Sequence, residues 1–313
     1  MPRGLDFITV GFWNIEKHYK ITADKSVPFG YQMSASTYFV VEQIVNWYRT
    51  YHVDVIVLAE VVDGSGAGDR FMHYLATRLN AVGYPAPAFR SGFRWSPTRS
   101  GTKSVCNFGF LWNTEVPGLQ GLGERVSWYW EKDHTRPALI LPTDVATIGA
   151  IHAKASRGNR KDGKQPPYNQ AMKEISEAAL HIGRQNRPGL LIGDMNVPFD
   201  SVPFDWKRTM AQYGWGQVPP NVAPTHVTRG LDEFKRYEGR HASVLDYAWR
   251  NPGIAQCLPE NPHPGYQSWD YVDHAPIMYH VATTANELPI VILEEKKNEG
   301  QGRSAAARRP VPA

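Results

Sequence analysis

The chain contains very little cysteine: Cys106 and Cys257 are the only two among its 313 residues. Two cysteines are too few for a disulfide scaffold, and their spacing fits no zinc motif. At this length the chain can instead bury a large hydrophobic core. We therefore expect both cysteines to be small buried residues.

A long apolar run is also absent. No stretch approaches the ~20 apolar residues that a membrane-spanning helix needs. The N-terminus has a charge at Asp6 and no small-residue cleavage site, so it does not resemble a secretory signal. These absences predict a protein that does not act on a membrane. The sequence leaves the oligomeric state open, and we expect a monomer. We expect it in the cytoplasm, or exported by a signal-independent route.

Charge of one sign is not in large excess, since the formal net charge is +4. The segment Glu294 to Ala313 has five basic and three acidic residues, so it carries +2 and leaves only +2 for the rest of the chain. The apolar share of 42% and the charged share of 20% are ordinary for a soluble globular protein. Bulk charge therefore does not identify a polyanionic partner, and only local clusters can.

Apolar patterns predict many short strands and few helices. The predicted strands are Phe7–Trp13, Val53–Ala59, Phe108–Trp112, Ala138–Leu141, Thr147–Ile151, Leu190–Ile192, Val244–Trp249 and Pro276–Val281. Helical spacing marks Thr37–Tyr51, Asp69–Ala81 and Asn169–Arg184. This composition favours an α+β sandwich of two packed sheets. We expect one catalytic domain over residues 1–285 and a disordered charged tail over 286–313.

Several predicted strands end abruptly in a polar residue able to bind a metal or a phosphate. These residues are Asn14, Glu60, His152, Asp194 with Asn196, Asp246, and Asp273 with His274. One such residue is weak evidence, because carboxylates and amides often end strands and start turns. Several together are more informative, because strand ends on one side of a sandwich meet at one rim and can share a site.

The segment Leu190 to Asn196 is the most informative. In extended backbone, Asp194 and Asn196 would point to the same side, and Gly193 would let the backbone approach a ligand closely. The acid can orient or deprotonate water, and the amide can donate to a phosphate oxygen as charge builds. The alternative interpretation is an Asx turn that merely follows a strand.

An acid and an imidazole also occur together at Asp273 and His274. The alternative is a structural histidine. A buried Asp246 could fix the tautomer of His274 and raise its basicity. Glu60 offers the hard oxygen ligand that Mg²⁺ or Ca²⁺ prefers, whereas no Cys/His cluster in the sequence suits zinc.

Taken in order, these motifs resemble the endonuclease/exonuclease/phosphatase superfamily, which has the DNase I-like fold. The resemblance runs from Phe7 to Val281 and rests on Asn14, Glu60, Arg136-Pro137, His152, Gly193-Asp194-Met195-Asn196, Thr225, Asp246 and Asp273-His274. It implies a four-layered α/β sandwich of two packed mixed sheets flanked by helices. It also implies phosphoester hydrolysis dependent on Mg²⁺ or Mn²⁺, with Ca²⁺ as a further option.

The resemblance implies a role for each matched residue. The implied metal ligands are Asn14, Glu60 and Asp273, and the implied catalytic residues are His152, Asp194, Asp246 and His274. Asp194 would orient or activate water, and Asp246 would orient His274. Substrate would be held by Arg136, Asn196 and Thr225.

Local strings are similar to the branch of DNase I and the cytolethal distending toxin nuclease subunit. They are His152-Ala153-Lys154-Ala155 and Pro224-Thr225-His226. One departure concerns residues 103–107, which contain no acid where DNase I has the glutamate that pairs with its first histidine. The partner of His152 is therefore left open by the sequence.

Two segments are locally basic. Arg90 to Lys103 holds four basic residues and no acid, interleaved with Phe93 and Trp95, and Lys154 to Lys164 holds five basic residues against Asp162. Such segments suit contacts with a phosphate backbone, although a solvated loop is the alternative. We expect a DNA endonuclease. A lipid or inositol phosphoesterase is the alternative, and a non-catalytic binding module would not need Glu60 or Asp194.

Overall fold

The protein is described from a computed structural model. The structure describes residues 7–15, 22–23, 31–32, 34–61, 66–82, 87–96, 107–155, 168–227, 242–262 and 272–283. The predicted tail over 286–313, Cys106, and the basic stretches 97–103 and 156–164 lie outside the described residues.

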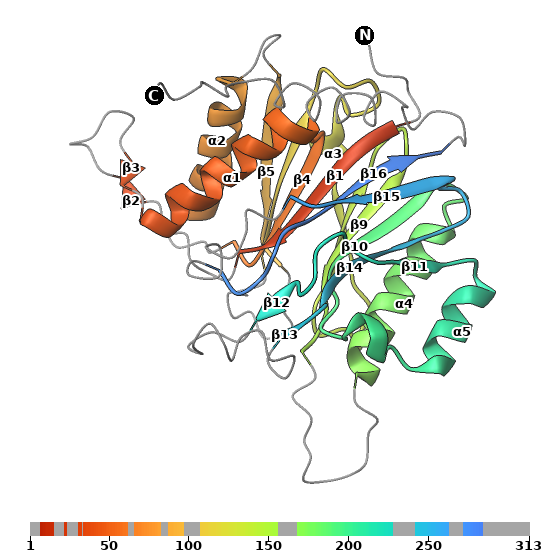
Figure 1. The fold of residues 1–313 in the computed structure, drawn as a ribbon. Helices are drawn as coiled ribbons and strands as arrows, with labels where there is room; N and C mark the ends of the chain where they lie inside the picture. The colour runs from red at the N-terminus through yellow and green to blue at the C-terminus, as the bar shows by residue number, and fades with distance from the viewer. Residues whose placement is uncertain are drawn as a thin grey trace, which may run out of the picture.

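Two six-stranded sheets form the centre of the molecule (Figure 1). The first contains β1 (Phe7–Asn14), β4 (Val55–Ala59), β5 (Phe89–Arg94), β6 (Phe108–Asn113), β15 (Gln256–Glu260) and β16 (Ile277–Ala282), in the order β15-β16-β1-β4-β6-β5. The second contains β7 (Ser127–Tyr129), β8 (Ala138–Pro142), β9 (Thr147–His152), β10 (Gly189–Asp194), β11 (Gly216–Val218) and β14 (Asp246–Arg250), in the order β11-β14-β10-β9-β8-β7. Two short ribbons pair β2 (Thr22–Ala23) with β3 (Tyr31–Gln32) and β12 (His226–Val227) with β13 (Ala242–Ser243).

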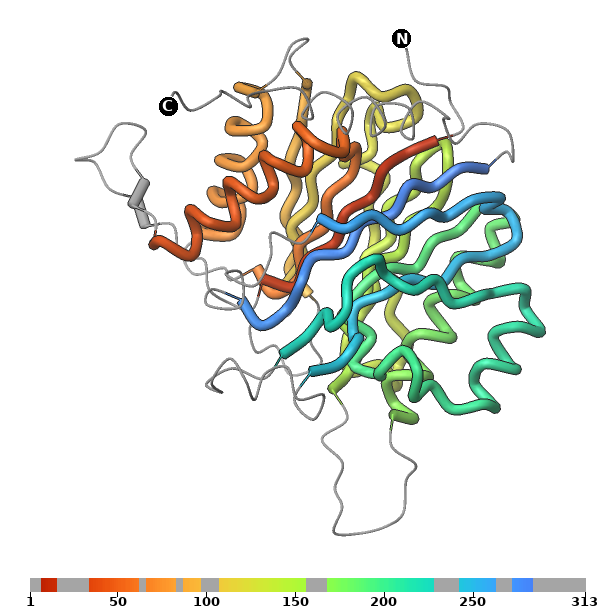
Figure 2. The backbone as a smooth tube through the Cα atoms, in the orientation of Figure 1, coloured from red at the N-terminus to blue at the C-terminus, as the bar shows by residue number. Residues whose placement is uncertain are grey.

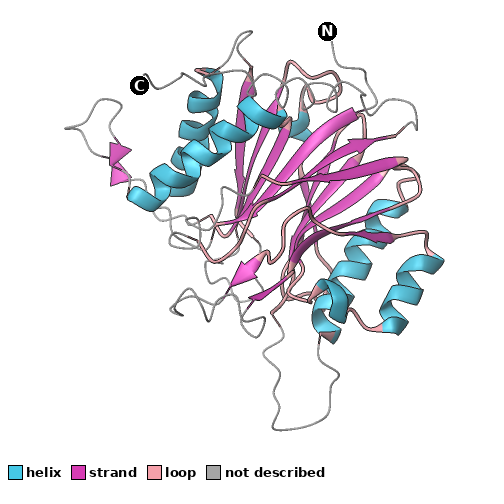
Figure 3. Ribbon diagram, viewed as in Figure 1, coloured by secondary structure: helices cyan, strands magenta, loops and turns pink. Residues whose placement is uncertain are grey.

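Helices cover the outer face of each sheet (Figure 3). The outer-face helices are α1 (Ala35–Tyr51), α2 (Ala67–Asn80), α4 (Asn169–Gly183) and α5 (Phe204–Gln212). The short helix α3 (Leu122–Arg125) instead contributes Leu122 to the core between the sheets, and a 3₁₀ turn spans Phe199–Ser201. Helices α1 and α2 pack on the first sheet, and α4 and α5 on the second. With the two sheets between them, this arrangement gives four layers and confirms the predicted sandwich.

Alternation along β1 shows how one strand serves two cores. Val10 and Phe12 belong to the cluster between the sheets, while Trp13 belongs to the cluster under α1, where it packs on Trp47 with ring centroids 5.6 Å apart. Successive side chains of a strand point to opposite faces, so a strand covered on both faces must be apolar throughout. This is why the central strands appear in the sequence as continuous apolar runs.

Each sheet has a parallel pair at its centre. Strands β1 and β4 pair in parallel and are connected through α1, and β9 and β10 pair in parallel and are connected through α4 (Figure 2). Parallel strands need such a crossover, and the crossover leaves both carboxyl ends at the same edge of the sheet. The polar residues that end these strands are therefore gathered in two neighbouring pairs.

The central strands and three long helices were predicted, but the peripheral elements were not. Strand β5 has the sequence Phe-Arg-Ser-Gly-Phe-Arg and β15 contains Pro259, and both lie at sheet edges. Edge strands carry charges and proline because one side of their backbone needs no partner, and this composition resembles a loop. The expected basic loop at Arg90 to Lys103 thus begins as an edge strand. None of the helices among the described residues is long and apolar enough to cross a bilayer.

Candidate functional site

The two parallel pairs place four polar side chains at one rim. Asn14 ends β1, and Glu60 directly follows β4. In the second sheet His152 and Asp194 are register partners at the ends of β9 and β10. The sheets meet here, because Asn14 Nδ2 donates to Asp194 Oδ2 at 3.1 Å.

Antiparallel neighbours add two more residues to this rim. Asp246 begins β14 and is the register partner of Asp194. His274 precedes β16, and its carbonyl oxygen accepts a hydrogen bond from Trp13 Nε1 at 2.8 Å. Buried backbone contacts of this kind hold His274 beside the strand ends.

Asp194 is the centre of the cluster. Its Oδ2 atom lies 3.4 Å from His152 Nε2 and 3.7 Å from His274 Nε2. His152 Nε2 also lies 3.5 Å from Glu60 Oε1. Among the described residues, the carboxylates beside His152 are therefore those of Glu60 and Asp194, while residues 103–106 lie outside the description.

The electrostatics of the cluster couple two buried acids to one histidine. Burial raises the pKa of Asp194 despite the opposing effect of His274, and burial likewise raises the pKa of Asp246. Burial alone would lower the pKa of His274, but the carboxylates of Asp246 and Asp194 outweigh it and raise the pKa to about 10. The direction of this shift favours the protonated form of His274.

Asp246 fixes the orientation of His274. Its Oδ2 lies 2.8 Å from His274 Nδ1, which leaves Nε2 facing Asp194. Thr225 supports Asp246, because its hydroxyl oxygen accepts from the backbone N–H groups of Leu245 and Asp246 at 2.8 and 2.9 Å. Thr225 is completely buried, so its position favours support of Asp246 over the predicted contact with substrate.

The turn after β10 differs from the expected extended segment. Asn196 has φ 50°, and its N–H donates to Asp194 Oδ1 at 3.0 Å, so the backbone forms an Asx turn. Asp194 and Asn196 therefore do not point to one side as alternate strand residues. Asn196 Nδ2 instead donates to the carbonyl oxygen of Ala153 at 2.9 Å, and Arg136 Nη1 donates to the same oxygen at 3.1 Å.

Gly193 is required for a reason other than the expected one. A Cβ at this position would lie 1.9 Å from the carbonyl oxygen of Ile151 on the neighbouring strand β9. The close approach at Gly193 is therefore between strands β10 and β9.

Glu60 occupies a left-handed backbone conformation, with φ 59°. Such a φ costs a non-glycine residue about 1 kcal/mol or more, so the surroundings must enforce it. Asn107 contributes to this by donating from Nδ2 to the carbonyl oxygen of Val61 at 3.2 Å and accepting from the N–H of Ser96 at 3.0 Å. Asn107 was not recognised in the sequence because it looks like an ordinary residue before a strand.

The rim carries side-chain oxygens of the type that binds a divalent cation, but Glu60 is in neither group of ligand atoms that lie within 4.8 Å of one another. Asn14, Glu60, Asp194 and Asp273 present the oxygen ligands that Mg²⁺ and Mn²⁺ prefer. Two groups of ligand atoms each lie within 4.8 Å of one another: Asp194, Asp246 and His274, and His226, Asp273 and His274.

Two residues of the site were not predicted. The His226 ring lies 4.7 Å from that of His274 between centroids, and His226 was noted only as part of a short string. Burial and the cationic His274 lower the pKa of His226 to about 4. Glu174 on α4 is fully buried and accepts from the N–H groups of Thr135 and Lys154, which flank Arg136 and Ala153.

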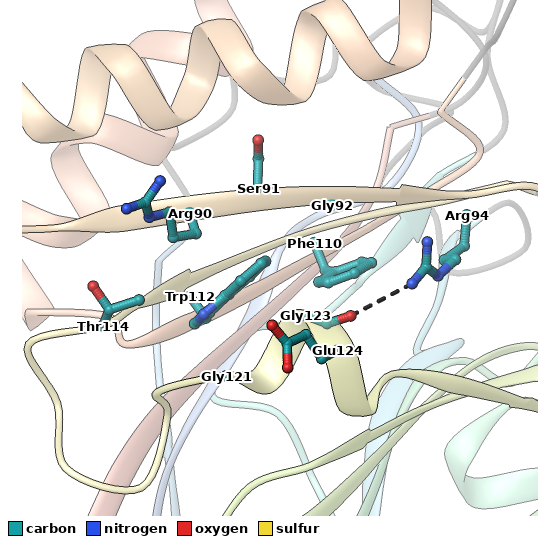
Figure 4. A pocket seen from close by; sticks show the side chains of 10 residues that line it. All are labelled: Arg90, Ser91, Gly92, Arg94, Phe110, Trp112, Thr114, Gly121, Gly123 and Glu124. Carbon is teal, nitrogen blue, oxygen red and sulfur yellow. Dashed lines mark hydrogen bonds between the residues drawn. The ribbon is translucent and has the colours of Figure 1, made fainter.

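A groove lies apart from this cluster, between β5 and α3, and its charged lining residues are Arg90, Arg94 and Glu124 (Figure 4). It has a volume of about 420 Å³ and is lined by the stacked rings of Phe110 and Trp112, whose centroids are 5.6 Å apart. Arg90 and Arg94 border it, and Arg94 Nη2 donates to the carbonyl oxygen of Gly123 at 3.4 Å.

The strand register connects this groove to the rim. Arg94 pairs with Phe108, and Phe108 pairs with Ala59, the residue before Glu60. The Arg94 end of the groove is therefore at the same end of the first sheet as Glu60.

Comparison with known proteins identifies the family. The model of the Endonuclease/Exonuclease/phosphatase family matches residues 12–264, which is most of the chain. The chain belongs to this family. Endonuclease/exonuclease/phosphatase members are hydrolases of phosphoester bonds and generally use divalent metals, which agrees with the oxygen donors at the rim.

Solved structures of the family share the fold. TDP2 from Caenorhabditis elegans has a TM-score of 0.52 at 13% identity, covering 88% of this chain and 75% of its own. The 3'-5' exonuclease NExo from Neisseria meningitidis has a TM-score of 0.52 at 12% identity, covering 87% and 98%. The human Nocturnin catalytic domain has a TM-score of 0.50 at 14% identity, covering 89% and 94%. The sequence has no significant match among curated proteins.

Proposed function

We propose that this protein is a divalent-metal-dependent phosphodiesterase that cleaves DNA, on the DNase I-like branch of its family. The observation that carries the proposal is the position of Asp194. Its carboxylate contacts Asn14 across the two sheets and lies within 3.7 Å of both His152 and His274. A buried acid between two imidazoles is suited to directing water at a phosphate held between them.

Asn14, Glu60 and Asp273 would hold the metal ion. When bound, a divalent cation would supply positive charge that stabilises the pentavalent transition state and favours the ionised form of Asp194. Glu60 and Asp194 are both within 3.5 Å of His152 Nε2, so the acids and the first histidine form one continuous polar surface.

Side chains of this protein would activate the water, donate to the phosphate and hold the substrate. Asp194 orients or deprotonates the attacking water, and cationic His274, held by Asp246, donates from Nε2 to a phosphate oxygen. Arg136 and Asn196 meet at the carbonyl oxygen of Ala153, and Arg136 also donates to that of His152. Their remaining N–H groups, which have no acceptor among the described residues, would donate to the substrate. A positive donor that is already oriented needs no rearrangement as charge develops on the phosphate.

Two observations favour nucleic acid as the substrate. The groove beside β5 places Arg90 and Arg94 along a line that begins at the Glu60 end of the sheet. Arginines placed next to a site contact the phosphates that flank the scissile one. A fold relative, the 3' phosphatase NExo from Neisseria, has been solved bound to a product DNA hairpin, with a TM-score of 0.51 at 12% identity.

Nicking of supercoiled plasmid tests the proposal. The purified chain should convert supercoiled to open-circular DNA with Mg²⁺ or Mn²⁺, and EDTA should stop the reaction. His152→Ala and His274→Ala should each lose activity, whereas His73→Ala, at an exposed position of α2, should not.

Failure to cut plasmid, single-stranded DNA or RNA with either metal would refute the nuclease assignment. Release of phosphate or phosphocholine from lipid substrates in its place would support the lipid or inositol phosphoesterase alternative.

A further inference from the structure

Two histidines far apart in the sequence face each other beside the site. The N–H of Val227 donates to the carbonyl oxygen of Asp273 at 3.0 Å, and the N–H of Ala275 donates to that of Thr225 at 2.7 Å. These two bonds flank the antiparallel bridge between His226 and His274. Directly opposite residues that are not hydrogen-bonded to each other have the closest side chains in such a pair. The register therefore forces the imidazoles together.

A carboxylate completes a ligand set with these imidazoles. One ligand atom each from His226, Asp273 and His274 lies within 4.8 Å of the others. His274 Nε2 is 3.8 Å from Asp273 Oδ1, and Nδ1 of the same ring is held by Asp246 at 2.8 Å. A metal-binding histidine is normally oriented by a carboxylate on its other nitrogen, which is the arrangement found here.

The chemistry of this set differs from that of the oxygen-rich set around Glu60. Two imidazoles and one carboxylate suit a transition metal such as zinc, whereas Mg²⁺ prefers oxygen ligands alone. We propose that His226, Asp273 and His274 form a second, zinc-type site that overlaps the catalytic site at Asp273 and His274, and that zinc bound there inhibits hydrolysis. The sequence did not indicate it because the two histidines are 48 residues apart and no motif spans them.

Zinc would inhibit hydrolysis because it binds the Nε2 atom of His274. This inhibitory effect rests on the proposed function. The Nε2 atom of His274 faces Asp194 at 3.7 Å and is the atom proposed to contact the phosphate. Zinc can bind Nε2 only after displacing its proton to solvent, and the zinc-bound nitrogen can no longer donate to the phosphate. Asp273 would also be shared between the two metal sites, so zinc would compete with the catalytic cation.

Calorimetric titration with zinc tests the site directly. The whole 313-residue chain is first stripped of bound metal and then equilibrated with excess Mg²⁺. Wild type and the control His73→Ala should bind one zinc ion per chain with equal affinity. His226→Phe keeps a ring against His274 but removes the ligand nitrogen, and should bind zinc at least about tenfold more weakly. Its thermal unfolding should confirm that it folds. Glu60→Gln should bind zinc no more weakly than wild type, because Glu60 is not a ligand of this site.

Equal zinc affinity in wild type and His226→Phe, or a loss of affinity in Glu60→Gln, would overturn the proposed site. The inhibitory role is measured by hydrolysis of bis(4-nitrophenyl) phosphate in Mg²⁺, each variant being compared with its own zinc-free rate. Half-inhibition by zinc should need at least about tenfold more zinc in His226→Phe. An unchanged zinc requirement would refute inhibition through this site. If wild type hydrolyses no phosphodiester at all, the proposed function fails, while calorimetry still decides the zinc site.

Discussion

Glu174 offers the sharpest test of how the outer helix positions the site. Its Oε1 accepts from the N–H of Thr135 at 2.7 Å and from Gln170 Nε2 at 3.0 Å, and its Oε2 accepts from the N–H of Lys154 at 2.9 Å. The carboxylate is fully buried. It therefore connects α4 to the segment that carries Arg136 and to the segment that follows β9.

The substitution Glu174→Gln replaces one acceptor oxygen by a donating NH₂ group. If the NH₂ group of the new amide faces Lys154, the backbone N–H of Lys154 loses its acceptor. If the NH₂ group faces Thr135, the backbone N–H of Thr135 loses its acceptor instead. An unsatisfied buried donor costs about 1–3 kcal/mol. Because 1 kcal/mol corresponds to about 2–4 °C in a domain of this size, we expect the Tm to fall by about 4–8 °C for a loss of about 2 kcal/mol.

Thermal unfolding followed by circular dichroism measures this effect. The matched control is Glu42→Gln, which breaks the partly exposed ion pair between Glu42 and Arg78, and should cost less than about 1 kcal/mol. In plasmid nicking, Glu174→Gln should raise KM more than it lowers kcat, because Arg136 is displaced while Asp194 and His274 are not. Equal Tm values for the two variants, or an unchanged KM, would refute the positioning role.

Three further substitutions test the site and its scaffold. Asp246→Asn should lower kcat by about 10²–10⁴-fold with little change in KM, because His274 loses its orienting charge. Since the carboxylates raise the His274 pKa from 6.5 to about 10, its stabilising contribution is complete below about pH 6.5 and is lost as pH rises through about 10. The alkaline limb of the rate profile should accordingly move to lower pH in Asp246→Asn, and a limb that stays in place would contradict this assignment. Glu60→Gln should raise the Mg²⁺ concentration for half-maximal nicking by about tenfold or more, since a hard ligand is lost, and an unchanged Mg²⁺ titration would remove Glu60 from the metal site. Gly193→Ala should destabilise the protein by about 3 kcal/mol in urea unfolding, because its Cβ would lie 1.9 Å from the Ile151 carbonyl oxygen, and full stability would show that β9 and β10 can separate there.

The central architecture could be predicted from the sequence because strands that are buried on both faces consist almost entirely of apolar residues. Strands β1, β4, β9 and β10 are buried along their whole length and appear as apolar runs. The polar residue that interrupts each run is where the strand leaves the core. The edge strands β5 and β15 have no continuous apolar run, because their exposed sides tolerate charged residues and proline.

The roles of individual side chains depended on contacts that composition does not record. Glu174 lies on an amphipathic helix where an acid is ordinarily exposed, and only the fold turns it inward toward Thr135 and Lys154. The sequence did not indicate that the buried hydroxyl of Thr225 accepts from the backbone N–H of Asp246, while its predicted contact with substrate stays a prediction. Both outcomes depend on which distant segment packs against the residue.

By itself, the sequence determined the two-sheet sandwich and the polar residues at the strand ends, because both follow from local apolar runs and from the residues that end them. The family followed from the resemblance that those residues carry when taken in order. The tertiary structure decided which of those residues meet. It placed Asp194 between His152 and His274, joined Arg136 and Asn196 at one carbonyl oxygen, and set His226 against His274. The physical reason is register: strand pairing fixes which residues lie opposite one another across long sequence separations, and a shift of one position would turn every side chain to the other face.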